Sequence, residues 1–200
     1  MIYNIYWNKN VKVFKLSIYI LTGQIGSGKS EAQKIFQNLK YSCFCADSIV
    51  RDLYKEDYII NKIKQILPEI VNDRDINMDL MRELLFSNHK LMKKIEDYIQ
   101  PLVFNEFPNI IGSYKENIIF IIPIIRNTQF FKKYKTIYIY ADEKKRRERI
   151  QSRNNYNKEM INSIFSYQKS IDNYKTNSDY IIENNGTLEE LKKKLLKIVK

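Results

Sequence analysis

The chain has 200 residues, 44% of them hydrophobic, and a formal net charge of +11. This length suits one α/β domain with a small inserted lobe, and no apolar run approaches the roughly 18 residues of a membrane span. The first residues lack the basic-then-apolar pattern of a signal peptide, so we expect a cytoplasmic protein with no membrane partner. The excess lysines are typical of solvated helix faces, so we expect no nucleic-acid partner either.

Metal-binding residue types are scarce. The chain has two cysteines, Cys43 and Cys45, and a single histidine, His89. The cysteines alternate on an apparent strand and therefore share one face, where two buried, reduced thiols are the better interpretation. A cysteine- or histidine-based metal cluster is therefore not expected.

A phosphate-binding motif dominates the first fifth of the chain. Residues 18–21 form an apolar run typical of a buried strand, and residues 23–30 read Gly-Gln-Ile-Gly-Ser-Gly-Lys-Ser. Apolar residues then recur at helical spacing, and strand, glycine loop and helix is the context that a phosphate loop needs. The loop amides and the helix dipole would face an anion, Lys29 would reach the β- and γ-phosphates, and the Ser30 hydroxyl would ligate Mg²⁺.

The next segment combines a second strand with a long helical stretch. Residues 41–45 predict a strand, after which Asp47 is expected to cap a helix, with Arg51 one turn later on the same face. From about residue 57 to 114 the apolar spacing is helical, and one stripe is interrupted before Pro101. No convincing strand is visible in this stretch, so we interpret it as a helical lobe inserted between strands.

The last third returns to alternating strands and helices. Strands are predicted at residues 118–122, 137–140 and 180–182, and a basic helix carries Arg149 and Arg153 four residues apart. Asn157 is expected to cap a helix that reaches about Gln168, and Thr187 with Glu190 predicts a capping box for the final helix. The pattern predicts an α/β fold: a P-loop NTPase-type parallel sheet flanked by helices.

A phosphate loop alone does not separate kinases from GTPases and ATPases. A guanine reader of the form Asn-Lys-x-Asp is missing, because the nearest stretch, residues 61–64, lacks the aspartate. A small kinase needs a carboxylate near the acceptor hydroxyl and arginines over the phosphates, and Asp47 with Arg149 and Arg153 meets that need. The plainer alternatives are that Asp47 is only a helix cap and that the arginines lie on a solvated face.

Several separated motifs together resemble the dephospho-coenzyme A kinase family, from Ile18 to Val199. They comprise residues 21–30, the Ala-Asp-Ser-Ile-Val-Arg segment at 46–51, residues 84–87, 95–96 and 101–103, Arg149, Arg153, Gln168, and residues 179–186. The order and spacing of the set are specific, whereas each motif alone is weak. The resemblance implies an ATP-dependent phosphotransferase that acts on the 3′-hydroxyl of dephospho-CoA, the last step of coenzyme A biosynthesis.

The resemblance also implies roles for individual residues. The residues expected to bind ATP are Gly23, Gly26, Ser27, Gly28, Lys29, Ser30, Glu31, Asn184, Asn185 and Gly186. The expected catalytic residues are Lys29, Asp47, Arg149 and Arg153; Asp47 and Arg51 would bind the acceptor, and Ser30 would bind Mg²⁺. Residues 17–200 would form one kinase domain, with the acceptor lobe at about 57–114 and a lid at about 143–175. Residues 1–16 would be an extension of unknown role.

Some positions depart from the family pattern. Cys45 and Ile121 each replace an aspartate of the family, and Gln100 replaces a histidine. Asn77-Met78 replaces Asp-Arg, Arg126-Asn127 replaces Phe-Glu, and Ile164 replaces a lid arginine. Two alternatives therefore stay open: a P-loop kinase for a nucleoside or another small metabolite, and a nucleotide-binding protein with little turnover. The sequence leaves the oligomeric state open.

Overall fold

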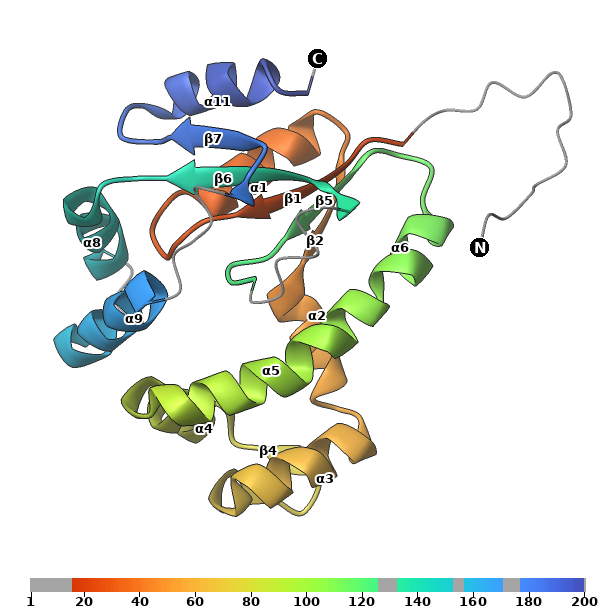
Figure 1. Cartoon of the computed structure of the whole chain (residues 1–200), viewed down its shortest axis with the longest axis vertical. Coiled ribbons are helices and arrows are strands. Elements are labelled where there is room, and N and C mark those ends of the chain that lie inside the picture. The colour runs from red at the N-terminus through yellow and green to blue at the C-terminus, as the bar shows by residue number, and fades with distance from the viewer. Residues whose placement is uncertain (1–15, 126–132, 153–156, 171–176, 200) are drawn as a thin grey trace, which may run out of the picture.

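The fold is taken from a computed structural model that describes residues 16–125, 133–152, 157–170 and 177–199. Within these ranges a five-stranded sheet carries helices on both faces (Figure 1). Every neighbouring pair of its strands is parallel. The predicted α/β fold with a parallel sheet is confirmed. The predictions for residues 1–15 and for Arg153 lie outside the described residues.

The central sheet has the strand order β2-β5-β1-β6-β7. The strands are β1 (Ile18–Thr22), β2 (Ser42–Cys45), β5 (Ile118–Ile121), β6 (Lys135–Tyr140) and β7 (Tyr180–Glu183). All five predicted strands are confirmed within one or two residues. The four residues of β5 are all buried, as expected for an isoleucine- and phenylalanine-rich strand that is covered on both faces.

One face of the sheet is covered by α1 (Lys29–Asn38) and α11 (Leu188–Leu196). Side chains alternate along a strand, so Tyr19 and Leu21 pack on this face while Ile20 packs on the other. Thr187 caps α11 by accepting a hydrogen bond from the backbone of Glu190 at 3.2 Å, which confirms the predicted N-cap. The final helix is thereby held against the same face as the helix that follows the phosphate loop.

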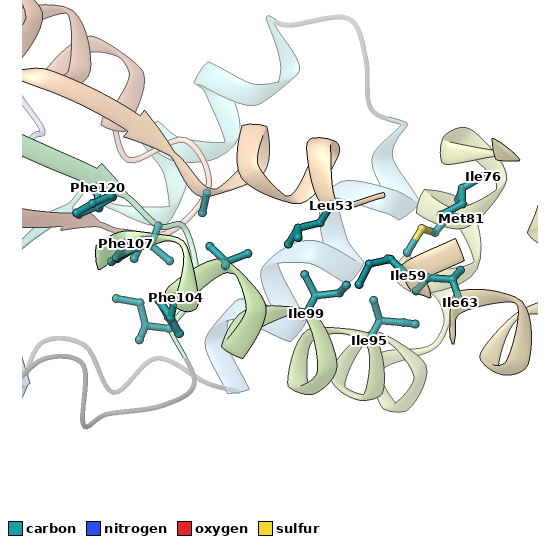
Figure 2. Packing of buried hydrophobic residues seen from close by; sticks show 14 of the residues in the cluster. Leu53, Ile59, Ile63, Ile76, Met81, Ile95, Ile99, Phe104, Phe107 and Phe120 are labelled. Atoms are coloured by element: carbon teal, nitrogen blue, oxygen red, sulfur yellow. The ribbon is translucent and has the colours of Figure 1, made fainter. Parts of the chain in front are cut away.

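The opposite face packs against α2 (Ala46–Leu53), α5 (His89–Asn105) and α6 (Phe107–Ser113). The ring of Phe107 stacks on Phe120 of β5, with centroids 3.7 Å apart and planes 6° apart. Figure 2 shows that this core continues away from the sheet to α3 (Asp57–Ile66) and α4 (Met78–Ser87). The helical segment shares one hydrophobic core with the sheet, and that core fixes its position beside the strand ends.

Two details of the helical segment differ from the prediction. A short hairpin joins β3 (Val71–Asn72) to β4 (Asp75–Ile76), after a 3₁₀ turn at Pro68–Ile70. Two-residue strands are too short to show alternation; the signal was the run of turn-forming residues around Asp73, which adopts φ 51°. In addition, α5 continues through Pro101 because Val103 and Phe104 beyond it are buried in the core.

Two further helices, α8 (Glu143–Gln151) and α9 (Lys158–Ser170), lie beyond the carboxyl end of β6 (Figure 1). Asn157 caps α9 as predicted, accepting a hydrogen bond from the backbone of Met160 at 2.8 Å. Among the described helices, none is both long and apolar enough to span a bilayer.

Candidate active site

The predicted phosphate loop connects β1 to α1, which begins at Lys29. Gly23 has a φ of 149°, and a Cβ atom there would lie 2.3 Å from the carbonyl oxygen of Ile139 in β6. Gly28 has a φ of 109°, and its Cβ would lie 2.1 Å from Nδ2 of Asn184. The loop therefore needs glycine both for its conformation and for its close contacts with β6 and the turn after β7.

The polar groups of the loop leave room for an anion. Lys29 Nζ donates to the carbonyl oxygens of Gly23 at 2.6 Å and Gln24 at 3.1 Å. The Ser27 hydroxyl oxygen is buried and has no hydrogen-bond partner among the described residues. Ser30 lies exposed in the first turn of α1. Phosphate oxygens would give Lys29 and Ser27 charged partners, and the Ser30 hydroxyl is a hard oxygen donor suited to Mg²⁺.

The predicted turn at residues 184–186 braces the phosphate loop. Asn184 is buried, and its Nδ2 donates to the Ser27 carbonyl at 2.8 Å while its backbone N–H donates to Tyr140 at 2.7 Å. Asn185 accepts a hydrogen bond from the backbone of Asp142 at 2.9 Å. A side chain at Gly186 would collide with the Glu190 carboxylate. The turn is thus placed against the loop, and its contact with ATP stays a prediction.

Arginines of α8 contact the same loop. Arg149 Nη1 donates to the Gly26 carbonyl at 3.2 Å, and Nη2 donates to the Asn184 carbonyl at 2.9 Å. Arg146, which was not among the predicted site residues, is buried and donates to the carbonyls of Ala141 at 3.0 Å and Ile25 at 3.4 Å. Its position three residues before Arg149, and so on the same helix face, was the available signal.

Glu31 is placed differently from its neighbours in the loop. Its carboxylate forms an exposed ion pair with Lys34 at 2.8 Å, one turn along α1. The side chain is therefore engaged on the helix surface, and the expected role of Glu31 in ATP binding stays a prediction.

Asp47 lies inside α2, so the prediction that it caps this helix is wrong. The N-cap is Cys45, which has extended backbone angles and no side-chain capping bond, and the helix begins at Ala46. The strand sets this boundary, because Cys45 is still paired with Ile121 of β5. Asp47 and Arg51 line the same cavity one turn apart, as their spacing predicts.

The pKa of the Cys45 thiol depends on charges from both the phosphate loop and α2. Burial raises the pKa of Cys45, the Asp47 carboxylate raises it further, and the Lys29 ammonium lowers it. The Lys29 ammonium and the Asp47 carboxylate therefore both affect the pKa of this thiol. Both cysteines are free and half-buried instead of fully buried.

A cavity of about 760 Å³ opens between α2, α4, α5, α9 and the segment after β5. Its wall is mainly apolar, and its polar lining consists of Asp47, Arg51, Tyr54, Arg82, Glu96, Gln100, Tyr167 and Gln168. Gln100 Nε2 donates to the Ile124 carbonyl at 3.1 Å and so ties α5 to the segment after β5. Ile164 is buried in the wall and Met78 is exposed where α4 begins, so with Gln100 three of the departures from the family pattern line this cavity.

Helix α9 closes one side of the cavity. Tyr167 donates a hydrogen bond from its hydroxyl to Glu96 of α5, and Gln168 accepts one from the backbone N–H of Ile25 in the phosphate loop at 2.7 Å. The pair Tyr167–Glu96 had no local sequence signal, because its members are 71 residues apart. The cavity therefore adjoins the phosphate loop through α9.

Comparison with known proteins assigns the family. The family described as dephospho-CoA kinase matches residues 17–190. A dephospho-CoA kinase from Gamma-proteobacterium EBAC31A08 is 33% identical over 182 residues, covering 88% of this chain and 91% of the relative.

Solved structures show the same fold. A Thermus thermophilus crystal structure matches with a TM-score of 0.69 at 21% identity, covering 92% of this chain and 96% of that one. A dephospho-CoA kinase from Campylobacter jejuni matches with a TM-score of 0.63 at 20% identity, covering 91% and 94%. With a family match over most of its length, this chain belongs to the dephospho-CoA kinase family.

Proposed function

We propose that this chain transfers the γ-phosphoryl group of ATP to the 3′-hydroxyl of dephospho-CoA. Family membership supports the reaction. The structural observation that carries the proposal is a large, mainly apolar cavity that Asp47 lines and that adjoins the phosphate loop through the hydrogen bond from Ile25 to Gln168. An apolar wall suits the pantetheine arm of the acceptor, and the neighbouring loop suits the phosphates of the donor.

The phosphate loop would bind and orient the donor. Lys29 would exchange its bonds to the Gly23 and Gln24 carbonyls for the β- and γ-phosphates of ATP. Arg149, which already lies against the loop at Gly26, would stabilise charge on the transferring group. Arg153 is proposed to act beside it on the strength of the resemblance alone.

Asp47 would orient the acceptor hydroxyl. As the 3′-oxygen forms its bond to the γ-phosphorus, the bond from that phosphorus to the bridging oxygen breaks and ADP leaves. The hydroxyl proton passes to the Asp47 carboxylate, while Arg51, one turn away on the same wall, would hold the acceptor. Asp47 is not the N-cap of α2, and it lines the cavity in which this acceptor would bind.

Mg²⁺ is part of the proposal. The Ser30 hydroxyl would hold the ion together with phosphate oxygens, and the ion would offset the charge of the phosphates. The described residues contain no group of three or more His, Cys, Asp or Glu side chains that could hold a metal by themselves. Ser30 would accordingly share the ion with the substrate.

The domain organisation follows the same assignment. We propose that residues 17–200 form one kinase domain, with the helical segment at about 57–114 as the acceptor lobe and about 143–175 as the lid. Residues 1–16 would be an extension. Use of ATP as a co-substrate favours the cytoplasm, where ATP is available. We propose ATP and dephospho-CoA as partners, with no nucleic-acid or membrane partner.

Turnover with a panel of acceptors tests the function. The chain is incubated with ATP, Mg²⁺ and either dephospho-CoA, a nucleoside or a small hydroxylated metabolite, and products are weighed by mass spectrometry. We expect one phosphoryl group to be added to dephospho-CoA alone. Faster phosphorylation of another acceptor, or no phosphorylated product from any of them, would overturn the proposal.

A further inference from the structure

Both backbone groups and the side chain of Ile25 in the phosphate loop contact α8 or α9. Its N–H donates to Gln168 of α9 at 2.7 Å, and its carbonyl accepts from Arg146 of α8 at 3.4 Å. Its side chain packs on a separate small core made of Ile150, Ile161 and Phe165. A loop residue that is bound on both backbone groups takes its position from those two helices.

The opposite side of α9 is bound to the helical segment. The Ser163 hydroxyl donates to the Phe86 carbonyl of α4 and lies 3.0 Å from Nε2 of His89. Tyr167 donates to Glu96 of α5. Since Tyr167 and Gln168 are consecutive, α9 contacts the acceptor cavity and the phosphate loop at the same level of the helix.

Gln168 belongs to both sites. It is buried and lines the cavity, and its side-chain carbonyl oxygen accepts the hydrogen bond from the phosphate loop. Its amide NH₂ group has no hydrogen-bond partner among the described residues. An amide has one accepting and one donating end, so the same side chain can hold Ile25 and donate to a ligand in the cavity.

We propose that Gln168 is a positioning residue that couples occupation of the acceptor cavity to the geometry of the phosphate loop; this rests on the function proposed above. An acceptor in the cavity fixes Gln168, and Gln168 fixes the Ile25 amide. The donor phosphates then meet a loop in its transfer geometry when the acceptor is present. Without that bond, the loop binds ATP but favours transfer less over hydrolysis by water.

The experiment compares Gln168→Met with Gln168→Glu. Methionine keeps the length of the side chain without its polar ends, so exchange of the Ile25 amide hydrogen should become faster while β1 amides are unchanged. We expect kcat for transfer to fall by about tenfold, the usual size of one lost hydrogen bond, with both KM values within about threefold. The ratio of ATP hydrolysis to transfer should rise. Glutamate keeps an acceptor oxygen and should restore protection of the Ile25 amide.

Ser163→Ala is the matched control. It removes the contacts of α9 with Phe86 and His89, and Ser163 lies outside the cavity lining, so the Ile25 amide should stay protected and the hydrolysis-to-transfer ratio should stay low. Wild-type kcat and ratio in Gln168→Met, or the same loss in Ser163→Ala, would overturn the proposal. Amide exchange needs no acceptor, so unchanged exchange at Ile25 in Gln168→Met overturns the proposal even if dephospho-CoA proves to be no substrate.

Discussion

The phosphate loop and the acceptor cavity are built in opposite ways. The loop is eight consecutive residues whose backbone forms the site, and its surroundings exclude side chains at Gly23 and Gly28. The cavity is lined by side chains from α2, α4, α5 and α9 that are brought together only by the fold. The loop site is formed by consecutive backbone groups and braced by α8, α9 and the turn after β7, whereas most cavity side chains can change without changing the loop.

Loss of Lys29 would produce the largest difference between the two regions. Lys29→Ala should abolish transfer, because the lysine supplies the charge that holds the phosphates. Its bonds in the structure are to loop carbonyls and its side chain is only part-buried, so the melting temperature should change little. Steady-state assays with ATP and Mg²⁺, together with thermal denaturation, test this. Near-normal turnover of the variant would mean that the loop does not bind the donor.

Asp47→Asn tests the acceptor side. Turnover should fall by ~10²–10⁴, the usual size of a general-base effect, while ATP affinity stays the same. Asp47 lies in the first turn of α2 and is not its cap, so the loss of its charge near the helix dipole should cost about 0.3–1 kcal/mol. Kinetics, ATP titration and urea denaturation separate these effects. A folded variant with wild-type turnover would leave Asp47 without a catalytic role.

A pair of glycine variants compares the loop with the helical segment. Gly28→Ala would place a Cβ at a φ of 109° and against Asn184, and should destabilise the fold by about 1–3 kcal/mol or more. Gly112→Ala in α6 meets no atom within 4 Å and should stabilise by about 0.5 kcal/mol. Chemical denaturation measures both. Equal changes in the free energy of unfolding at the two positions would show that the loop has room for a side chain at Gly28.

The smallest expected effect concerns the two cysteines of β2. Lys29 lowers the pKa of Cys45, so binding of ATP to Lys29 should cancel that influence and slow alkylation of Cys45 by a few-fold, since the thiolate is the reactive form. Burial raises the pKa of Cys43 to about 11, so Cys43 should react slowly with or without ATP. Mass spectrometry after iodoacetamide treatment reads both sites. Protection of Cys43 alone would place the nucleotide elsewhere.

The phosphate loop could be predicted from the sequence more fully than the acceptor cavity could. The loop, its strand and its helix were predicted residue by residue, because their signals are contiguous. In the lobe, the hairpin at Val71–Ile76 was too short to show a pattern, and α5 passes through Pro101 because buried residues beyond it outweigh the lost backbone bond. Contacts such as Tyr167 with Glu96 depend on two helices meeting, which no local pattern specifies.

The position of β5 fixes the distance between the carboxyl ends of β1 and β2. It lies between β1, which leads into the phosphate loop, and β2, which leads into α2 and Asp47. Neighbouring strands are spaced by about 4.8 Å, so the two strand ends stand roughly 10 Å apart. Backbone hydrogen bonds on both sides of β5 maintain this distance between the strand ends, whatever side chains line the cavity. Substitutions in the helices can therefore alter which molecule is held, while the separation between the phosphate loop and the start of α2 is set by the sheet.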